Sequence, residues 1–64
     1  MLVNGEQKTV QNSVSLYEFL SSEGYDTQRV AVEKNGNIVP KDLFETEMLS
    51  DEDKLEVVCF VGGG

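Results

Sequence analysis

The chain has 64 residues, of which 12 are acidic, 5 are basic and none is histidine, so its net charge is −7 at pH 7. A chain of this length forms one domain that buries only about 60% of the surface its unfolded form exposes, which leaves little room for a catalytic pocket. The acidic balance disfavours nucleic acid and anionic membranes as partners, and the lack of histidine excludes Ser/His/Asp and Cys/His catalysis. We therefore expect a binding module, carrier or subunit that is not an enzyme and binds no metal or cofactor.

Cysteine usage and apolar runs indicate the compartment. The single cysteine, Cys59, cannot form an intramolecular disulfide. The first apolar stretch, residues 1–3, ends at Asn4 and is too short for a signal peptide. No run is long enough to span a bilayer. We therefore expect a cytoplasmic protein.

The first expected element is a β-hairpin over residues 1–11. Its turn is Asn4-Gly5, because Asn and Gly adopt the positive φ angles that two-residue hairpin turns require. Val3 and Val10, on either side of this turn, can share the inner face of the hairpin.

A short helix of about two to three turns is expected next, because both of its ends are signalled. Ser15 and Glu18 have the spacing of a capping box at the start. Gly24 supplies the left-handed residue that ends the helix. Apolar residues fall at helical spacing on one face between these signals, namely Leu16, Phe19 and Leu20.

A second hairpin is expected over residues 29–40, with Asn35-Gly36 as its turn and Pro40 ending its short return strand. The segment that follows looks irregular, with a short helical turn at residues 42–44. A polar turn at residues 50–54 then leads into the last strand.

The last strand, residues 55–61, has the strongest strand pattern in the chain and should lie centrally in the sheet, because both of its faces are apolar. Cys59 should face the helix and be buried and unreactive. These elements predict an α+β fold, with a mixed sheet of about four to five strands and one main helix packed on one face. We expect the domain to span residues 1–61 and a flexible Gly-Gly-Gly tail to span residues 62–64.

Four segments together carry a resemblance to a known family. They are "VNG" at 3–5, "LYEFL" at 16–20, "RVAVEKNGNIVP" at 29–40 and "VGGG" at 61–64. In this order and at this length, the chain resembles the thiamine-biosynthesis sulfur carrier family, ThiS, which has the ubiquitin-like β-grasp fold. The chain departs from the family at Phe44, where relatives often have Trp, and at residues 51–53, where relatives commonly have an Asp-Gly-Asp turn.

The resemblance implies a carrier that acts as a co-substrate of other enzymes. In this family an E1-like adenylyltransferase uses ATP to adenylate the C-terminal carboxylate, which here is that of Gly64. Sulfur relayed from a cysteine desulfurase or another donor then gives a thiocarboxylate, and thiazole synthase takes the sulfur. A tail of Gly62, Gly63 and Gly64 can enter a narrow channel of the partner, because glycine has no Cβ.

The resemblance also implies a docking surface next to the tail. Val58 and Phe60 are expected on the sheet face opposite the helix, and Leu2 on the neighbouring strand joins them; the alternative is scattered exposed apolar residues. We expect the chain to be a monomer on its own. Three other functions stay open: the small subunit of molybdopterin synthase, a ubiquitin-like protein modifier, and a plain binding domain whose glycine tail is inert.

Overall fold

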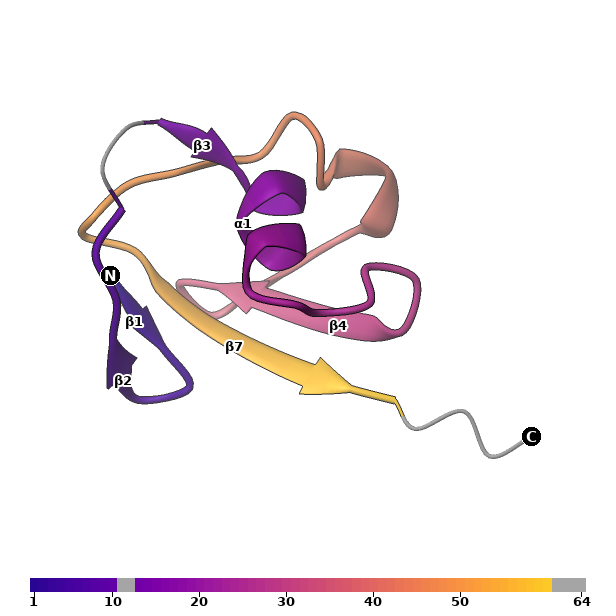
Figure 1. Ribbon diagram of the computed structural model, residues 1–64, viewed down its shortest axis with the longest axis horizontal. Coiled ribbons are helices and arrows are strands. Elements are labelled where there is room, and N and C mark those ends of the chain that lie inside the picture. The colour runs from indigo at the N-terminus through magenta and orange to yellow at the C-terminus, as the bar shows by residue number, and fades with distance from the viewer. Residues whose placement is uncertain (11–12, 61–64) are drawn as a thin grey trace.

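The computed structural model describes residues 1–10 and 13–60 (Figure 1). Two helical elements are present in this part of the chain: the α-helix α1 (Leu16–Ser22) and the 3₁₀ turn η1 (Lys41–Leu43). The strands are β1 (Leu2–Val3), β2 (Glu6–Gln7), β3 (Val14–Ser15), β4 (Val30–Lys34), β5 (Asn37–Val39), β6 (Met48–Leu49) and β7 (Lys54–Cys59).

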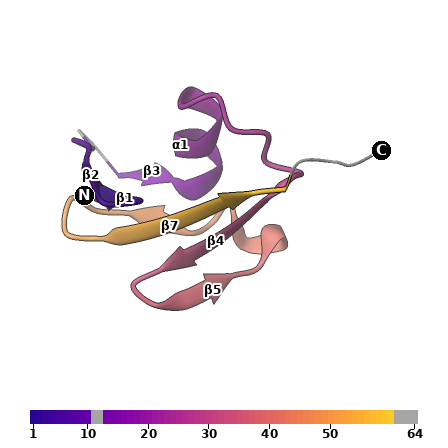
Figure 2. The same cartoon turned by 90° about the horizontal axis from the view of Figure 1, so that it is seen from below.

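The main structural element is a five-stranded mixed sheet with the order β2-β1-β7-β4-β5. The last strand, β7, lies at its centre, parallel to β1 and antiparallel to β4. Helix α1 packs across one face of this sheet (Figures 1 and 2). The predicted mixed sheet, the single main helix and the central last strand are thus confirmed, and the arrangement is that of a β-grasp. The expected boundary between a domain of residues 1–61 and a tail of residues 62–64 lies outside the described residues.

Both predicted hairpins are present, and their turns have the expected backbone geometry. The first is shorter than predicted, because β1 and β2 pair only over residues 2–3 and 6–7, and Val10 packs against the core from outside these strands. In the first turn Asn4 and Gly5 have φ angles of 51° and 84°, and in the second Asn35 and Gly36 have 53° and 86°. Two successive residues with positive φ form the turn that matches the natural twist of paired strands. The turn residues therefore determine the register of β1 with β2 and of β4 with β5.

The predicted caps of α1 are also confirmed. The backbone N–H of Glu18 donates to Ser15 Oγ at 3.0 Å, and the backbone N–H of Ser15 donates to Glu18 Oε1 at 3.2 Å. At the other end Gly24 has a φ of 85°, and the N–H of Tyr25 donates to the carbonyl of Leu20 at 2.9 Å. This is the pattern of a Schellman motif, which limits the helix to seven residues.

A second, two-stranded sheet was not predicted from the sequence. In it β3 pairs antiparallel with β6, so that Val14 lies opposite Leu49 and Ser15 opposite Met48. Two-residue strands have no alternation to detect, and their pairing depends on how the intervening chain folds. The η1 turn lies at Lys41–Leu43, one residue earlier than expected, and Phe44 is its C-terminal cap.

The hydrophobic core lies between α1 and the inner face of the sheet. Phe44 is only 2% exposed and forms part of it. The other buried apolar residues come from α1, β1, β4, β5, β6 and β7 and from the N-terminus, and are Met1, Val3, Leu16, Phe19, Leu20, Val30, Val32, Val39, Leu49, Leu55 and Val57.

The prediction that Cys59 is buried was wrong, because this cysteine is exposed. The strand alternates as expected at Leu55 and Val57, which are buried. Cys59, however, is the last residue of β7, where the strand extends past the two-turn helix (Figure 2). The side chain of Cys59 is therefore exposed, although it lies on the sheet face that α1 covers further along the strand.

Candidate functional site

Gly64, which we expect to react, and Gly62 and Gly63, which we expect to enter the partner's channel with it, lie outside the described residues. The geometry of the site is therefore that of the end of β7, from which this segment continues. The backbone N–H of Phe60 donates to the carbonyl of Arg29 at 2.7 Å, one residue beyond the β4–β7 pairing. The central strand thus holds the chain firmly in the sheet as far as Phe60.

An apolar patch lies beside this end of the chain, on the sheet face that is turned away from α1, which we call the outer face. Val58 and Phe60 lie there with 56% and 57% of their surfaces exposed. Val58 is directly opposite Ala31 on β4, whose side chain is exposed between the buried Val30 and Val32. We call Ala31, Val58 and Phe60 the outer-face patch.

The structure separates Leu2 from this patch. Leu2 is 38% exposed and pairs with Lys54, at the beginning of β7. Val58 is four positions after Lys54 along the strand, which corresponds to about 13 Å at 3.3 Å per residue. Leu2 therefore shares the outer face with Val58 and Phe60 but lies at the opposite end of the central strand.

Two outer-face residues, Ala31 and Ile38, were not identified from the sequence as site residues. Ile38 is 75% exposed and lies opposite Glu33 in the β4–β5 hairpin. The alternation of buried and exposed residues in β4 contained a signal for Ala31, because every second residue of a strand faces the same side. The pairing of β4 with β7, which brings Ala31 next to Val58, could not be deduced from this alternation.

Two acidic residues of the turn before β7 have structural partners. Asp51 accepts hydrogen bonds at 3.2 Å from the backbone N–H of Val10 and from the amino-terminal ammonium of Met1, and both interactions lower the pKa of Asp51. We infer that this carboxylate ties together three segments that are distant in sequence.

Asp53 holds the same turn onto the β4–β5 hairpin. It accepts hydrogen bonds from the Ser50 backbone at 2.8 Å and from the Asn35 side chain at 2.9 Å, and Lys34 Nζ lies 3.7 Å away. Burial raises the pKa of Asp53, but the hydrogen bonds from Asn35 and Ser50 and the charge of Lys34 outweigh it, so the pKa lies below its ordinary value. These contacts hold the turn against the β4–β5 hairpin.

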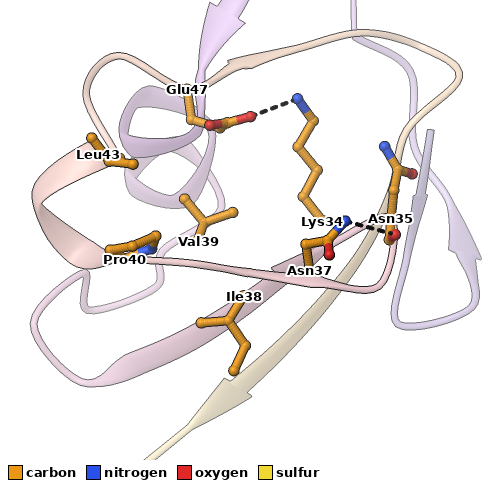
Figure 3. A pocket seen from close by; sticks show the side chains of 8 residues that line it. All are labelled: Lys34, Asn35, Asn37, Ile38, Val39, Pro40, Leu43 and Glu47. Carbon is orange, nitrogen blue, oxygen red and sulfur yellow. Dashed lines mark hydrogen bonds and ion pairs between the residues drawn. The ribbon is translucent and has the colours of Figure 1, made fainter.

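A hollow of about 290 Å³ lies beside β5 and η1 (Figure 3). Its two charged side chains pair with each other, since Lys34 Nζ lies 2.8 Å from Glu47 Oε2 and also donates to the carbonyl of Met48 at 2.9 Å. These polar groups are thus already satisfied within the chain. The remaining lining residues are Asn35, Asn37, Ile38, Val39, Pro40 and Leu43.

The described residues contain neither a cluster of metal-binding side chains nor a membrane-spanning helix. No three of their Asp, Glu and Cys side chains come together in a way that could hold a metal ion. None of the helices in this part of the chain has the length and apolar character needed to cross a membrane.

Comparison with known proteins identifies the family. The model of the ThiS family matches residues 1–64. The sulfur carrier protein ThiS of Bacillus subtilis is 33% identical over 63 residues, which cover 97% of this chain and 96% of that protein. The crystal structure of the thiamine biosynthesis protein ThiS from Geobacter metallireducens superposes with a TM-score of 0.81 at 33% identity, covering 98% of this chain and 96% of the other.

A longer relative has a different name. A thiazole synthase of Paramagnetospirillum magneticum is 41% identical over 64 residues, which are all of this chain but only 20% of that protein. This chain therefore spans about a fifth of that relative, and the similarity concerns one segment of it. The match of the family model over all 64 residues, together with the β-grasp sheet and its matching crystal structure, shows that the chain belongs to the ThiS family of sulfur carrier proteins in thiamine biosynthesis.

Proposed function

We propose that this protein carries sulfur on the C-terminal carboxylate of Gly64 and delivers it to thiazole synthase. The observation that carries the proposal is the match of the ThiS family over residues 1–64, which includes the glycines at 62–64. The protein is then a co-substrate and not a catalyst, and the catalytic groups and the ATP site belong to the partner enzyme. We take the free carrier to be a cytoplasmic monomer.

The proposed chemistry proceeds through an acyl-adenylate. A carboxylate oxygen of Gly64 attacks the α-phosphorus of ATP on an E1-like adenylyltransferase, and pyrophosphate leaves. A sulfur nucleophile then attacks the acyl carbon. With hydrosulfide as this nucleophile, the acyl–sulfur bond forms as the bond to the phosphate oxygen breaks, and AMP and one proton are released. A cysteine desulfurase is the proposed source of this sulfur, which it holds as an enzyme persulfide. A thiol reductant releases the outer sulfur as hydrosulfide, and a disulfide between that thiol and the desulfurase cysteine forms in the same step.

Glycine at these positions suits acyl transfer. A carboxylate becomes a good electrophile only when a phosphate leaving group is attached, and the attacking sulfur needs an unhindered carbonyl. Because Gly62, Gly63 and Gly64 have no Cβ, the segment can pass through a narrow channel and present its carbonyl. Ordering this segment in a channel costs entropy, which contacts of the folded domain must offset.

The outer-face patch is the proposed source of those contacts. Val58 and Phe60 are large, exposed and only a few residues from Gly64, and exposed apolar groups of this kind are typical of the buried centre of an interface. Leu2 would contact the partner only in an interface that extends along the whole of β7. One segment of a thiazole synthase resembles this chain, and this similarity supports thiazole synthase as a partner of the carrier.

The test is to detect the sulfur on Gly64. The protein is incubated with ATP, cysteine, a cysteine desulfurase, a thiol reductant and the adenylyltransferase of the same organism, and the thiocarboxylate is alkylated before the C-terminal peptide is sequenced by mass spectrometry. We expect the alkylated sulfur on Gly64. Alkylation matters because oxidation of a methionine adds nearly the same mass as exchange of oxygen for sulfur. An unmodified Gly64, with an adenylyltransferase that is active on another carrier, would exclude the proposal.

A further inference from the structure

Two glutamates face each other at the centre of the outer face. Glu33 on β4 and Glu56 on β7 are directly opposite in the antiparallel pairing, and both are exposed. The Cβ atoms of such partners are about 5 Å apart, and like charges in this position destabilise a sheet. The chain thus places two negative charges side by side where a neutral or oppositely charged pair would favour folding.

The described part of the chain offers no cation that balances this pair. The ion pairs formed there by its basic side chains are Lys8 with Glu23, Arg29 with Asp26, and Lys34 with both Glu47 and Asp53. The nearest base on the same face is Lys54, two residues before Glu56 in β7, and it lies within 4 Å of neither carboxylate. The two charges are therefore left to the solvent or to a partner.

Exposed apolar residues flank the two carboxylates on two sides. Ile38 lies opposite Glu33 on the edge strand β5, and Ala31 and Val58 lie one step further along the same two strands. A partner that covers the outer-face patch would remove water from this region. Two carboxylates without a cation would then be costly to bury, so a partner surface that fits this face must bring a positive charge.

We propose that Glu33 and Glu56 together bind an arginine side chain of the adenylyltransferase, next to the outer-face patch that the same enzyme covers. This inference rests on the proposed function, because it names the chemistry of the same docking surface. Arginine fits better than lysine, since its planar guanidinium has five donors in a fixed fork that can reach two carboxylates at once. It is also more weakly hydrated than an ammonium group, which suits apolar neighbours such as Ile38 and Val58.

The experiment compares variants that remove one charge each. Glu33→Gln and Glu56→Gln are matched with Glu45→Gln, an exposed glutamate that follows η1 and lines a hollow with Tyr17 and Phe44, away from the outer face. Binding to the adenylyltransferase of the same organism is measured by calorimetry at several salt concentrations, and urea unfolding is followed for each variant. Adenylation of the wild-type chain is measured alongside.

We expect Glu33→Gln and Glu56→Gln each to raise the Kd about tenfold, and to weaken its dependence on salt, because a charge-assisted hydrogen bond is lost. Glu45→Gln should change the Kd by less than about twofold. The urea midpoints of the two outer-face variants should be equal to or higher than that of the wild type, since like-charge repulsion is relieved. If the two variants bind more weakly than the wild type but are at least as stable, the two glutamates contribute to partner binding and not to folding.

Each outcome decides between the two proposals. If the wild-type chain is adenylated and all three variants bind equally well, the arginine site is wrong and the carrier function stands. If the wild-type chain binds through the two glutamates but is not adenylated, the surface stands and the proposed chemistry falls. A wild-type chain that neither binds nor is adenylated overturns both.

Discussion

The side-chain amide of Asn4 pairs with the backbone of Val57 as a third strand residue would. Its Nδ2 donates to the Val57 carbonyl at 3.1 Å, and its Oδ1 accepts from the Val57 N–H at 2.7 Å. The backbone N–H of Asn4 also donates to the carbonyl of Leu55 at 2.9 Å. Asn4 therefore both forms the first turn and extends the two-residue strand β1 along the central strand.

Asn4→Gly should separate these two roles. Glycine keeps the positive φ of the turn, so the variant loses mainly the two side-chain hydrogen bonds to Val57. We expect the free energy of unfolding to fall by about 1–2 kcal/mol, measured by urea denaturation. Asn37→Gly, in the second hairpin, is a control for the backbone freedom that an added glycine gives the unfolded chain. An unchanged urea midpoint in Asn4→Gly would show that the amide bridge does not stabilise the domain.

Asp53 should make stability depend on acid pH. The pKa of Asp53 in the folded protein is below its ordinary value, so the unfolded chain binds a proton at this carboxylate more tightly than the folded chain does. Protonation therefore favours unfolding. The stabilisation is complete above the pKa of the unfolded chain, about 3.9, and is lost as the pH falls through the lower folded value. We therefore expect Asp53→Asn to be less stable than the wild type at pH 7 and to lose less stability between about pH 5 and pH 3.

The measurement for Asp53 is a series of urea midpoints from neutral to acid pH. Glu52→Gln, in the same turn, changes the net charge equally and controls for general charge repulsion. Parallel pH curves for Asp53→Asn and the wild type would contradict the assignment.

Phe60→Ala should weaken docking and leave the fold intact. Phe60 is 57% exposed, so its removal opens little of the core. We expect the KM for the carrier in adenylation to rise about tenfold with kcat unchanged, because an aromatic anchor contributes to binding in ground and transition state alike. Leu43→Ala, 43% exposed on η1, is the matched control. An equal effect of both variants would mean that the outer-face patch is not the docking surface.

Gly63→Val tests whether the segment must pass through a narrow channel. A branched side chain at this position should obstruct the channel and displace the carboxylate, which we expect to slow adenylation by about 100-fold. The urea midpoint should stay as in the wild type, because the proposed role of this residue lies in the partner's channel. Gly63→Ala provides a graded control with a smaller side chain. Adenylation of the valine variant at the normal rate would exclude the channel.

Local chemistry was sufficient to predict the turns and the helix. An Asn-Gly pair selects positive φ angles wherever it occurs, and the caps of α1 involve residues only three to five positions apart. Such features depend on a few neighbouring residues, so the amino-acid sequence alone determines them. The family resemblance came from the same short segments in their order along the chain.

Long-range pairing decided the features that the pattern could not reveal. The β3–β6 pair, the distance between Leu2 and Phe60, and the opposition of Glu33 and Glu56 all depend on strand registers between distant segments. The exposure of Cys59 depends on where a two-turn helix stops covering the central strand. The alternation of residues along a strand predicts which face of the sheet a side chain lies on. Whether another element covers that side chain depends on how the elements pack in the tertiary structure.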